Sequence, residues 1–257
     1  YGYLDIGFSK YANLSLTGRY DKLSTLPDGN NLYFYPSASL STVVTDYLKL
    51  PDFISFLKFR GSYANVKGGL TNPTIGATPQ ASYPLGYGAE YNSPYDGPTC
   101  ENSATYTTPI LYDNKAGAYF TNTITNPIIQ PFSSEVVEAG MDIRFMKNRL
   151  GFDLTYFVNN DGPRIYQLPI SSASGFSTAL VNGITTRKKG WEATLTGNPI
   201  RTKSGFSWDV LVNWSTFKET LTSIYPGVDV LNVFYKVGDR IDKIYGSAFV
   251  RTPDGQL

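Results

Sequence analysis

The sequence predicts an all-β protein, an antiparallel transmembrane β-barrel to which these 257 residues would contribute about ten strands. Three observations favour this class. Apolar and polar residues alternate with a period of two, the alternating runs are about ten residues long, and short connections alternate with long ones.

The alternation is clearest between Val137 and Phe145. Odd-numbered positions of this run are apolar, whereas the even-numbered ones are Glu, Gly, Asp and Arg. Comparable runs extend from Leu150 to Val158 and from Phe206 to Trp214. Successive side chains of a strand point to opposite faces, so each run would have one apolar and one hydrophilic face. We expect the hydrophilic faces to point into the barrel; they carry Lys58, Arg60, Asp142 and Arg144.

The length of the runs separates a membrane barrel from a soluble sheet. A tilted strand needs about 9–11 residues to cross a bilayer, whereas soluble strands average about five or six. Phe206 and Trp214 bracket one apolar face, as the two aromatic girdles of a barrel would. Ordinary aromatic packing in a core would explain this pair equally well.

The connections are the third observation, because every second one is short. Outer-membrane barrels have short turns on the periplasmic side and long loops outside. The short connections are expected near Lys10–Tyr11, Asp46–Ser55, Met146–Arg149 and Pro199–Gly205. The long ones are expected at Arg19–Asn31, Val66–Ser133 and Asp161–Thr186, and after Lys218.

Composition excludes several function classes. Charged residues make up 17% of the chain, and the net charge of +1 gives no global field for nucleic acid. The absence of histidine excludes Ser-His-Asp and Cys-His catalysis and histidine-ligated metals. Glu138 and Asp142 share a face, but lining of the lumen explains them better than catalysis. We therefore expect no enzyme, no cofactor and no metal site.

The connection between Val66 and Ser133 is expected to be a folded extracellular excursion. It is rich in Gly, Pro, Asn, Thr and Tyr, and a connection of this length is usually functional or disordered. Tyrosine offers a ring and a polar tip for a sugar or peptide, so the candidate ligand-binding residues are four tyrosines of this excursion. Packing of loops on one another is the alternative for these four: Tyr83, Tyr87, Tyr91 and Tyr95.

A short basic run, Arg187-Lys188-Lys189, begins one of the predicted strands. It would suit the phosphates of lipopolysaccharide in the outer leaflet, or simply be solvated at the base of a loop. The chain opens inside a strand-like run and closes on a loop-like one, so we expect it to be part of a longer protein.

Several blocks resemble the SusC/RagA family of TonB-dependent transporters. Asn148–Phe157 (NRLGFDLTYF) is similar to that family's NRLGFDVTYY strand, and Lys188–Leu195 (KKGWEATL) to its NKGWE(V/A)TL. Lys188 replaces the usual Asn. Further blocks resemble the family in the same order: Tyr35–Ser39, Leu57–Tyr63, Leu168–Ser171, Ser174–Phe176, Val237–Gly238 and Tyr245–Gly246.

The resemblance implies an outer-membrane barrel of about 22 strands around a plug. It also implies import of oligosaccharides or peptides under a SusD-like surface lipoprotein, driven by TonB-ExbB-ExbD. Residues 1–257 would then be a partial barrel, with the plug, the TonB box and the C-terminal strands outside this sequence. Two alternatives stay open: a passive porin or adhesin barrel, and a soluble carbohydrate-binding β-sandwich.

Overall fold

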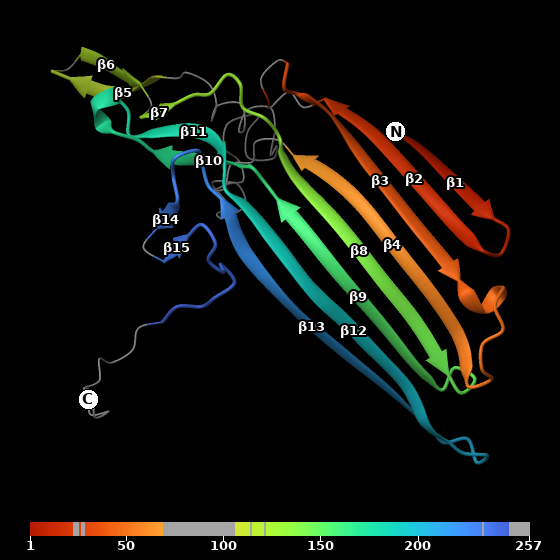
Figure 1. Ribbon diagram of the computed structural model, residues 1–257. Helices are drawn as coiled ribbons and strands as arrows, with labels where there is room; N and C mark the ends of the chain where they lie inside the picture. The colour runs from red at the N-terminus through yellow and green to blue at the C-terminus, as the bar shows by residue number, and fades with distance from the viewer. Residues whose placement is uncertain are drawn as a thin grey trace, which may run out of the picture.

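One eight-stranded antiparallel sheet dominates the structure (Figure 1). The computed structural model describes residues 1–22, 26, 29–68, 106–113, 115–120, 122–232 and 234–246. The strands follow one another across the sheet in chain order, as in a meander. They are β1 (Gly2–Phe8), β2 (Ala12–Lys22), β3 (Leu32–Val43), β4 (Ile54–Gly68), β8 (Phe132–Phe145), β9 (Leu150–Asp161), β12 (Thr185–Arg201) and β13 (Ser207–Ser223).

Shorter strands form three small sheets in the connections. β10 (Arg164–Pro169) pairs with β11 (Thr178–Gly183), which in turn pairs with β7 (Thr123–Ile124). The other two sheets are hairpins, and two 3-10 turns complete the elements: β5 (Tyr106–Tyr112) with β6 (Lys115–Phe120), β14 (Val230–Asn232) with β15 (Tyr235–Lys236), η1 (Val44–Asp46) and η2 (Ser172–Ser174). The expected number of barrel strands was therefore slightly high for the described residues, because strand-like runs in the long connections pair among themselves.

The strands alternate between short and long connections, as the sequence predicts. Residues 9–11, 44–53, 146–149 and 202–206 join strands at one end of the sheet, which we call the short-turn end. The long connections lie at the opposite end, the long-loop end, where β10 and β11 project beyond the sheet (Figure 1). β4 continues to Gly68 and β8 begins at Phe132, so the excursion expected between Val66 and Ser133 is slightly shorter than predicted.

Strand register places most of the large apolar residues of the eight strands on one face. Leu154 of β9, for example, pairs with Met141 of β8 and Ala193 of β12, which pairs in turn with Trp214 of β13. One residue further along, Asp153 pairs with Asp142 and with Thr194. We call these two sides the apolar face and the polar face. The predicted alternation within single runs is thus continuous across the whole sheet.

Nothing in the described residues covers the apolar face. Large side chains on it are roughly half exposed, including Leu4 at 53%, Leu40 at 52% and Val212 at 49%. A soluble monomer rarely exposes a contiguous apolar surface of this extent. Among the described residues, no helix is long and apolar enough to cross a membrane.

The only buried cluster of the described residues lies at the long-loop end. It joins Tyr33 of β3 to Leu26, Ile129 and Leu180 from three different connections. Ile129 is fully buried, and Tyr35 and Ile165 pack against the cluster. The connections are therefore anchored on the sheet by a small hydrophobic core of their own.

Candidate functional site

The centre of the polar face is crossed by one arginine. Arg60 of β4 makes a bidentate ion pair with Asp153 of β9, with Nη1–Oδ2 and Nη2–Oδ1 distances of 2.7 Å. Arg60 Nη2 also donates to Thr155 Oγ1 at 2.6 Å. The paired strand β8 lies between β4 and β9, so this side chain spans about two strand spacings of 4.8 Å each. A bidentate guanidinium–carboxylate pair fixes both direction and distance, and here it ties three strands together.

Gly140 of β8 is the reason that Arg60 can cross. It is the register partner of Arg60 on one side and of Thr155 on the other. A Cβ atom at Gly140 would lie 2.8 Å from both Cζ and Nε of Arg60. The guanidinium thus passes directly over a position without a side chain. This need for a glycine depends on register, which a single strand sequence does not contain.

A second ion pair lies beside the first on the polar face. Arg144 Nη2 is 2.9 Å from Asp142 Oδ2 within β8, and the guanidinium stacks over the ring of Phe56 at 4.9 Å. Lys58 is the register partner of Asp142. The expectation that Lys58, Arg60, Asp142 and Arg144 share one hydrophilic face is therefore confirmed. These charges neutralise one another in part, which suits a hydrated wall rather than a catalytic pair.

Near the long-loop end the polar face carries an aromatic and cationic group. The Arg19 guanidinium lies 4.5 Å from the centre of the Tyr35 ring and forms an ion pair with Asp21 at 2.8 Å. Arg19 and Tyr35, together with Tyr3 and Ser37, are among the residues that line a hollow of about 670 Å³ at this position. Cation–π contact and open aromatic rings can bind the faces of sugars or the backbone and side chains of peptides. Sequence reasoning did not single out this group, because its members come from separate strands.

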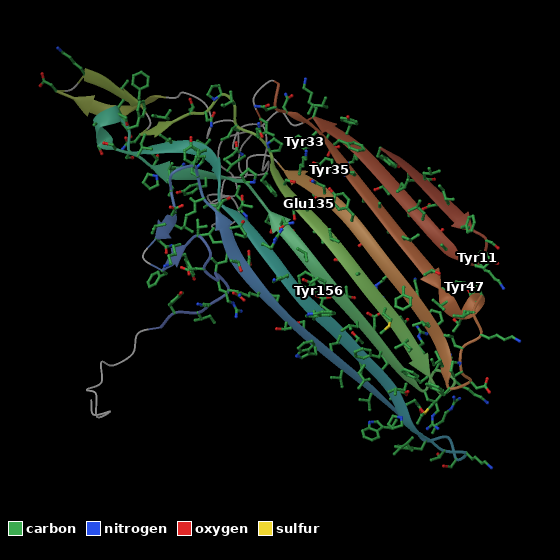
Figure 2. All side chains as sticks on the ribbon, in the orientation of Figure 1. Tyr11, Tyr33, Tyr35, Tyr47, Glu135 and Tyr156 are labelled. Carbon is green, nitrogen blue, oxygen red and sulfur yellow. The ribbon has the colours of Figure 1, made fainter. Side chains whose placement is uncertain are left out.

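Aromatic residues gather at both ends of the sheet, which Figure 2 shows with Tyr33 and Tyr35 at one end and Tyr11 and Tyr47 at the other. At the short-turn end, the rings of Tyr11 and Tyr47 are 5.3 Å apart and those of Phe53 and Phe145 6.2 Å apart. On the apolar face away from that end, Tyr156 contacts Trp191 at 4.7 Å and Tyr20 contacts Phe34 at 4.9 Å. The pairs at the short-turn end suit one interfacial girdle, whereas Tyr156 and Trp191 lie midway along their strands and Tyr33 and Tyr35 lie on the polar face.

The structure divides the basic run between the two faces. Lys188 Nζ lies on the polar face, 4.1 Å from the centre of the Phe217 ring. Arg187 belongs to the apolar side, where its Nε donates to Asn160 Oδ1 at 2.7 Å, and Lys189 pairs with Val158 on the same side. The four candidate tyrosines Tyr83, Tyr87, Tyr91 and Tyr95 lie outside the described residues.

An all-antiparallel meander with long strands, one uncovered apolar face, one charged face and loops sorted by length defines the wall of an outer-membrane β-barrel. In such a wall the apolar face meets lipid and the polar face meets the barrel interior. The family model "TonB dependent receptor-like, beta-barrel" matches residues 1–253. The chain therefore belongs to this family of outer-membrane barrels.

Relatives of known name support the assignment. TonB-dependent receptor P3 of Formosa agariphila is 24% identical over 224 residues, which is 86% of this chain and 20% of that protein. TonB-dependent receptor P26 of the same organism is 21% identical over 258 residues, covering 100% of this chain and 23% of that protein. The chain thus spans about a fifth to a quarter of the length of these relatives.

Solved structures share the fold. The RagAB peptide importer in its closed-closed state superposes with a TM-score of 0.72 at 16% identity, covering 92% of this chain and 24% of that one. Its open-open state gives a TM-score of 0.71 with the same coverage. The resemblance to the SusC/RagA family drawn from the sequence blocks is confirmed by this fold and by the family match.

Proposed function

We propose that these residues form part of the wall of an active outer-membrane importer, with the long-loop end outside the cell and the short turns in the periplasm. The observation that carries the proposal is the continuity of the two faces across eight strands, in a chain of this family. Short periplasmic turns and long outer loops are the rule for bacterial barrels. The excursion between β4 and β8 would then lie outside the cell.

The edges of the sheet support a larger barrel. Among the described residues, no strand pairs with the outer side of β1, and the outer side of β13 is paired only near its C-terminal end, by residues 238–241. Unpaired backbone groups in lipid cost several kcal/mol each, so a barrel wall must close. We propose that the rest of the protein supplies the missing strands, to about 22 in total, together with a plug and a TonB box.

The ligand class that we propose is a peptide or an oligosaccharide, captured under a SusD-like lipoprotein and released through TonB-ExbB-ExbD. The name of the RagAB peptide importer favours a peptide. The hollow beside Tyr3, Arg19 and Tyr35 supports either class, since it offers rings, a hydroxyl and a cation. The tyrosines of the excursion remain proposed contacts of the same ligand, and the basic run a proposed contact of lipopolysaccharide.

Orientation can be tested by labelling single cysteines on intact cells. In a cysteine-free background of the full-length receptor, which includes Cys100→Ser, a cysteine at Ser172 in η2 should react with a membrane-impermeant maleimide. A cysteine at Ser204, in the turn between β12 and β13, should react only after the outer membrane is opened. The reverse pattern would overturn the proposed orientation.

Active import can be tested separately by uptake in cells. A strain with the full-length gene deleted should show a growth defect on one of two substrates, a defined peptide mixture or a defined oligosaccharide. Removal of TonB should give the same defect. Uptake that persists without TonB would identify the passive porin instead. Normal growth on both substrates in the deletion strain would exclude the proposed ligand classes.

A further inference from the structure

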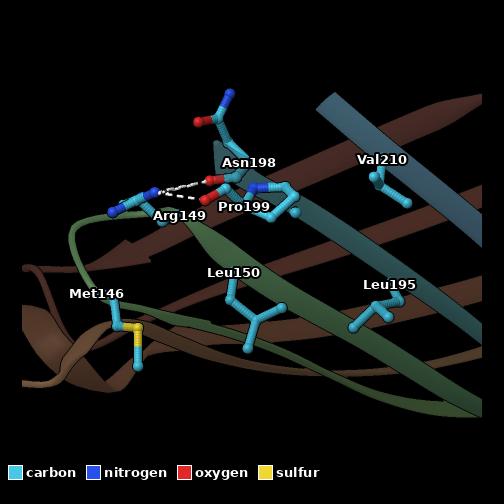
Figure 3. Close-up of a pocket in the computed structure, with 8 residues that line it drawn as sticks. Met146, Arg149, Leu150, Leu195, Asn198, Pro199 and Val210 are labelled. Atoms are coloured by element: carbon cyan, nitrogen blue, oxygen red, sulfur yellow. Dashed lines mark hydrogen bonds between the residues drawn. The ribbon is translucent and has the colours of Figure 1, made fainter. Parts of the chain in front are cut away.

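The apolar face contains a notch of about 450 Å³ at the short-turn end, between β9, β12 and β13 (Figure 3). A β-bulge creates it: β12 has two residues, Asn198 and Pro199, between Gly197, which pairs with Val210, and Ile200, which pairs with Trp208. A Cβ atom at Gly197 would be 3.9 Å from its nearest neighbours, an ordinary contact distance, so a side chain can be accommodated at this position. The apolar walls are Met146, Leu150, Leu195, Pro199 and Val210.

One cation is fixed at the rim of the notch. Arg149 Nε and Nη2 donate to the Asn198 carbonyl oxygen at 3.3 and 3.2 Å, and Nη2 donates to the Pro199 carbonyl oxygen at 2.9 Å (Figure 3). Within the described part of the chain, Nη1 makes no hydrogen bond. The guanidinium is thus held in place by the bulge and still has donors for an anion.

The two turns beside the notch carry only positive charge. Residues 146–149, and residues 200–206 at the end of β12 and in the turn after it, contain four exposed cations, Lys147, Arg149, Arg201 and Lys203, and no carboxylate. We call this group the basic turns. They are neighbours, because Asn198 N donates to the Arg149 carbonyl oxygen at 2.8 Å. The turn at 44–53 differs, since it has two carboxylates beside its one lysine.

We propose that the notch binds one phospholipid of the inner leaflet with an anionic headgroup, such as phosphatidylglycerol. One acyl chain lies along Leu150, Leu195 and Val210, and the phosphate is bound by Arg149 with the other cations of the basic turns around it. Arginine is well suited to phosphate oxygens, and clustered cations at a membrane surface recruit anionic lipid. The assignment of this lipid to the inner leaflet rests on the proposed function, in which the short turns lie in the periplasm.

The charge pattern favours lipid over a second copy of the chain. A twofold contact would place the same surface on both partners and bring four cations against four. Such like-charge contacts are unfavourable, whereas an anionic headgroup neutralises them. An acyl chain also accounts for the apolar walls, which free phosphate would leave unused.

Native mass spectrometry of the full-length receptor tests the proposal. The receptor is delipidated in mild detergent and offered phosphatidylglycerol or phosphatidylcholine with identical chains. We expect one phosphatidylglycerol to be retained and phosphatidylcholine to be retained less. Gly197→Leu, which fills the notch, should abolish this retention. Lys147→Gln with Arg201→Gln and Lys203→Gln should weaken it by about fivefold for each cation removed.

The matched control removes charge from other short turns. Lys10→Gln with Lys49→Gln should retain phosphatidylglycerol as the unchanged receptor does. The proposal would be overturned if Gly197→Leu retained as much phosphatidylglycerol as the unchanged receptor, or if phosphatidylcholine bound as well as phosphatidylglycerol. It would also be overturned if the control variant lost as much phosphatidylglycerol as the variant of the basic turns. A change in subunit number with Gly197→Leu would identify a protein contact in its place. None of these variants should affect uptake, so failure here is distinguishable from failure of the importer proposal.

Discussion

A pair of arginine substitutions in one strand tests the assignment of the two faces most directly. Ala193 and Thr194 are adjacent in β12 and therefore at nearly the same depth. Ala193 pairs with Leu154 and Trp214 on the apolar face. Thr194 pairs with Asp153 and donates from Oγ1 to Asn213 Oδ1 at 2.9 Å on the polar face. Ala193→Arg and Thr194→Arg thus place the same side chain on opposite sides of the wall.

The expected cost of each arginine in folding free energy follows from the depth of its position in the membrane. Ala193 is four residues from Gly197, which forms the last rung between β12 and β9 before the short turns. At about 3.3 Å per residue and a 45° tilt, Ala193 is about 9 Å further into the membrane, near the middle of an apolar band about 25 Å tall. Arginine there should cost about 2–4 kcal/mol of folding free energy. Thr194→Arg faces hydrated polar groups and should cost less than about 1 kcal/mol.

The assay is denaturant-induced unfolding of the full-length receptor in lipid vesicles, with the position of the heat-modifiable band on gels as a second measure. Val210→Arg adds a depth control, because Val210 is level with Gly197 near the interface and should cost only about 0–1 kcal/mol. Equal costs for Ala193→Arg and Thr194→Arg would refute the assignment of faces. A larger cost for Thr194→Arg would show that the charged side is the dry one.

Three further predictions concern the polar face and the long-loop end. Gly140→Ala should displace the Arg60 guanidinium and destabilise the barrel by about 1 kcal/mol, a small value because the ion pair is more than a third exposed. Denaturant unfolding in lipid measures this cost, and an unchanged midpoint would contradict the crossing of Arg60 over Gly140. Ile129→Ala should cost about 2–4 kcal/mol locally, because Ile129 is fully buried against Tyr33; faster proteolysis confined to the connections is the expected readout, and unchanged proteolysis would count against the cluster. A hydrogen bond from Arg240, opposed by desolvation, lowers the pKa of Asp242 from 3.8 to about 2. The stabilising effect of this ion pair is therefore complete above about pH 4 and is lost as the pH falls through about 2. Hydrogen exchange of the segment after β13 should accelerate in that window, and a flat profile would argue against the pair.

The fold could be predicted from the sequence because a two-residue period is a local property. Each run shows its own apolar side, and the connection lengths show which strand ends meet. Pro36 is instructive, since proline argues against a central strand. In the structure β3 pairs with β4 only from Ser37 onward, so Pro36 has β2 as its partner on one side and no β4 ladder on the other. Pairing limits of this kind are not local, and the sequence could not show them.

The site could be predicted only in part, for the same reason. Alternation placed Arg60 and Asp142 on one hydrophilic face, but not the partner that Arg60 selects. That choice depends on Gly140 lying between Arg60 and Thr155, which requires the register of three strands. The group around Arg19 and Tyr35 likewise requires the register of β2 with β3. The pattern of residue types predicted which face of the sheet each side chain lies on, whereas its contacts depend on how the strands are paired.

The positions of these groups along the strands separate two tasks of the polar face. Arg60 pairs with Ser41 of β3, nearer the short-turn end than Tyr35, and its ion pair with Asp153 joins β4 to β9, so the main effect of this pair is to stabilise the wall. The Arg19 and Tyr35 group lies at the long-loop end, next to the buried cluster that anchors the connections. A ligand arriving from that end would reach this group before it reached the Arg60–Asp153 pair. Substitutions there should change which ligands are taken up, whereas substitutions at Arg60 should change stability while leaving ligand preference the same.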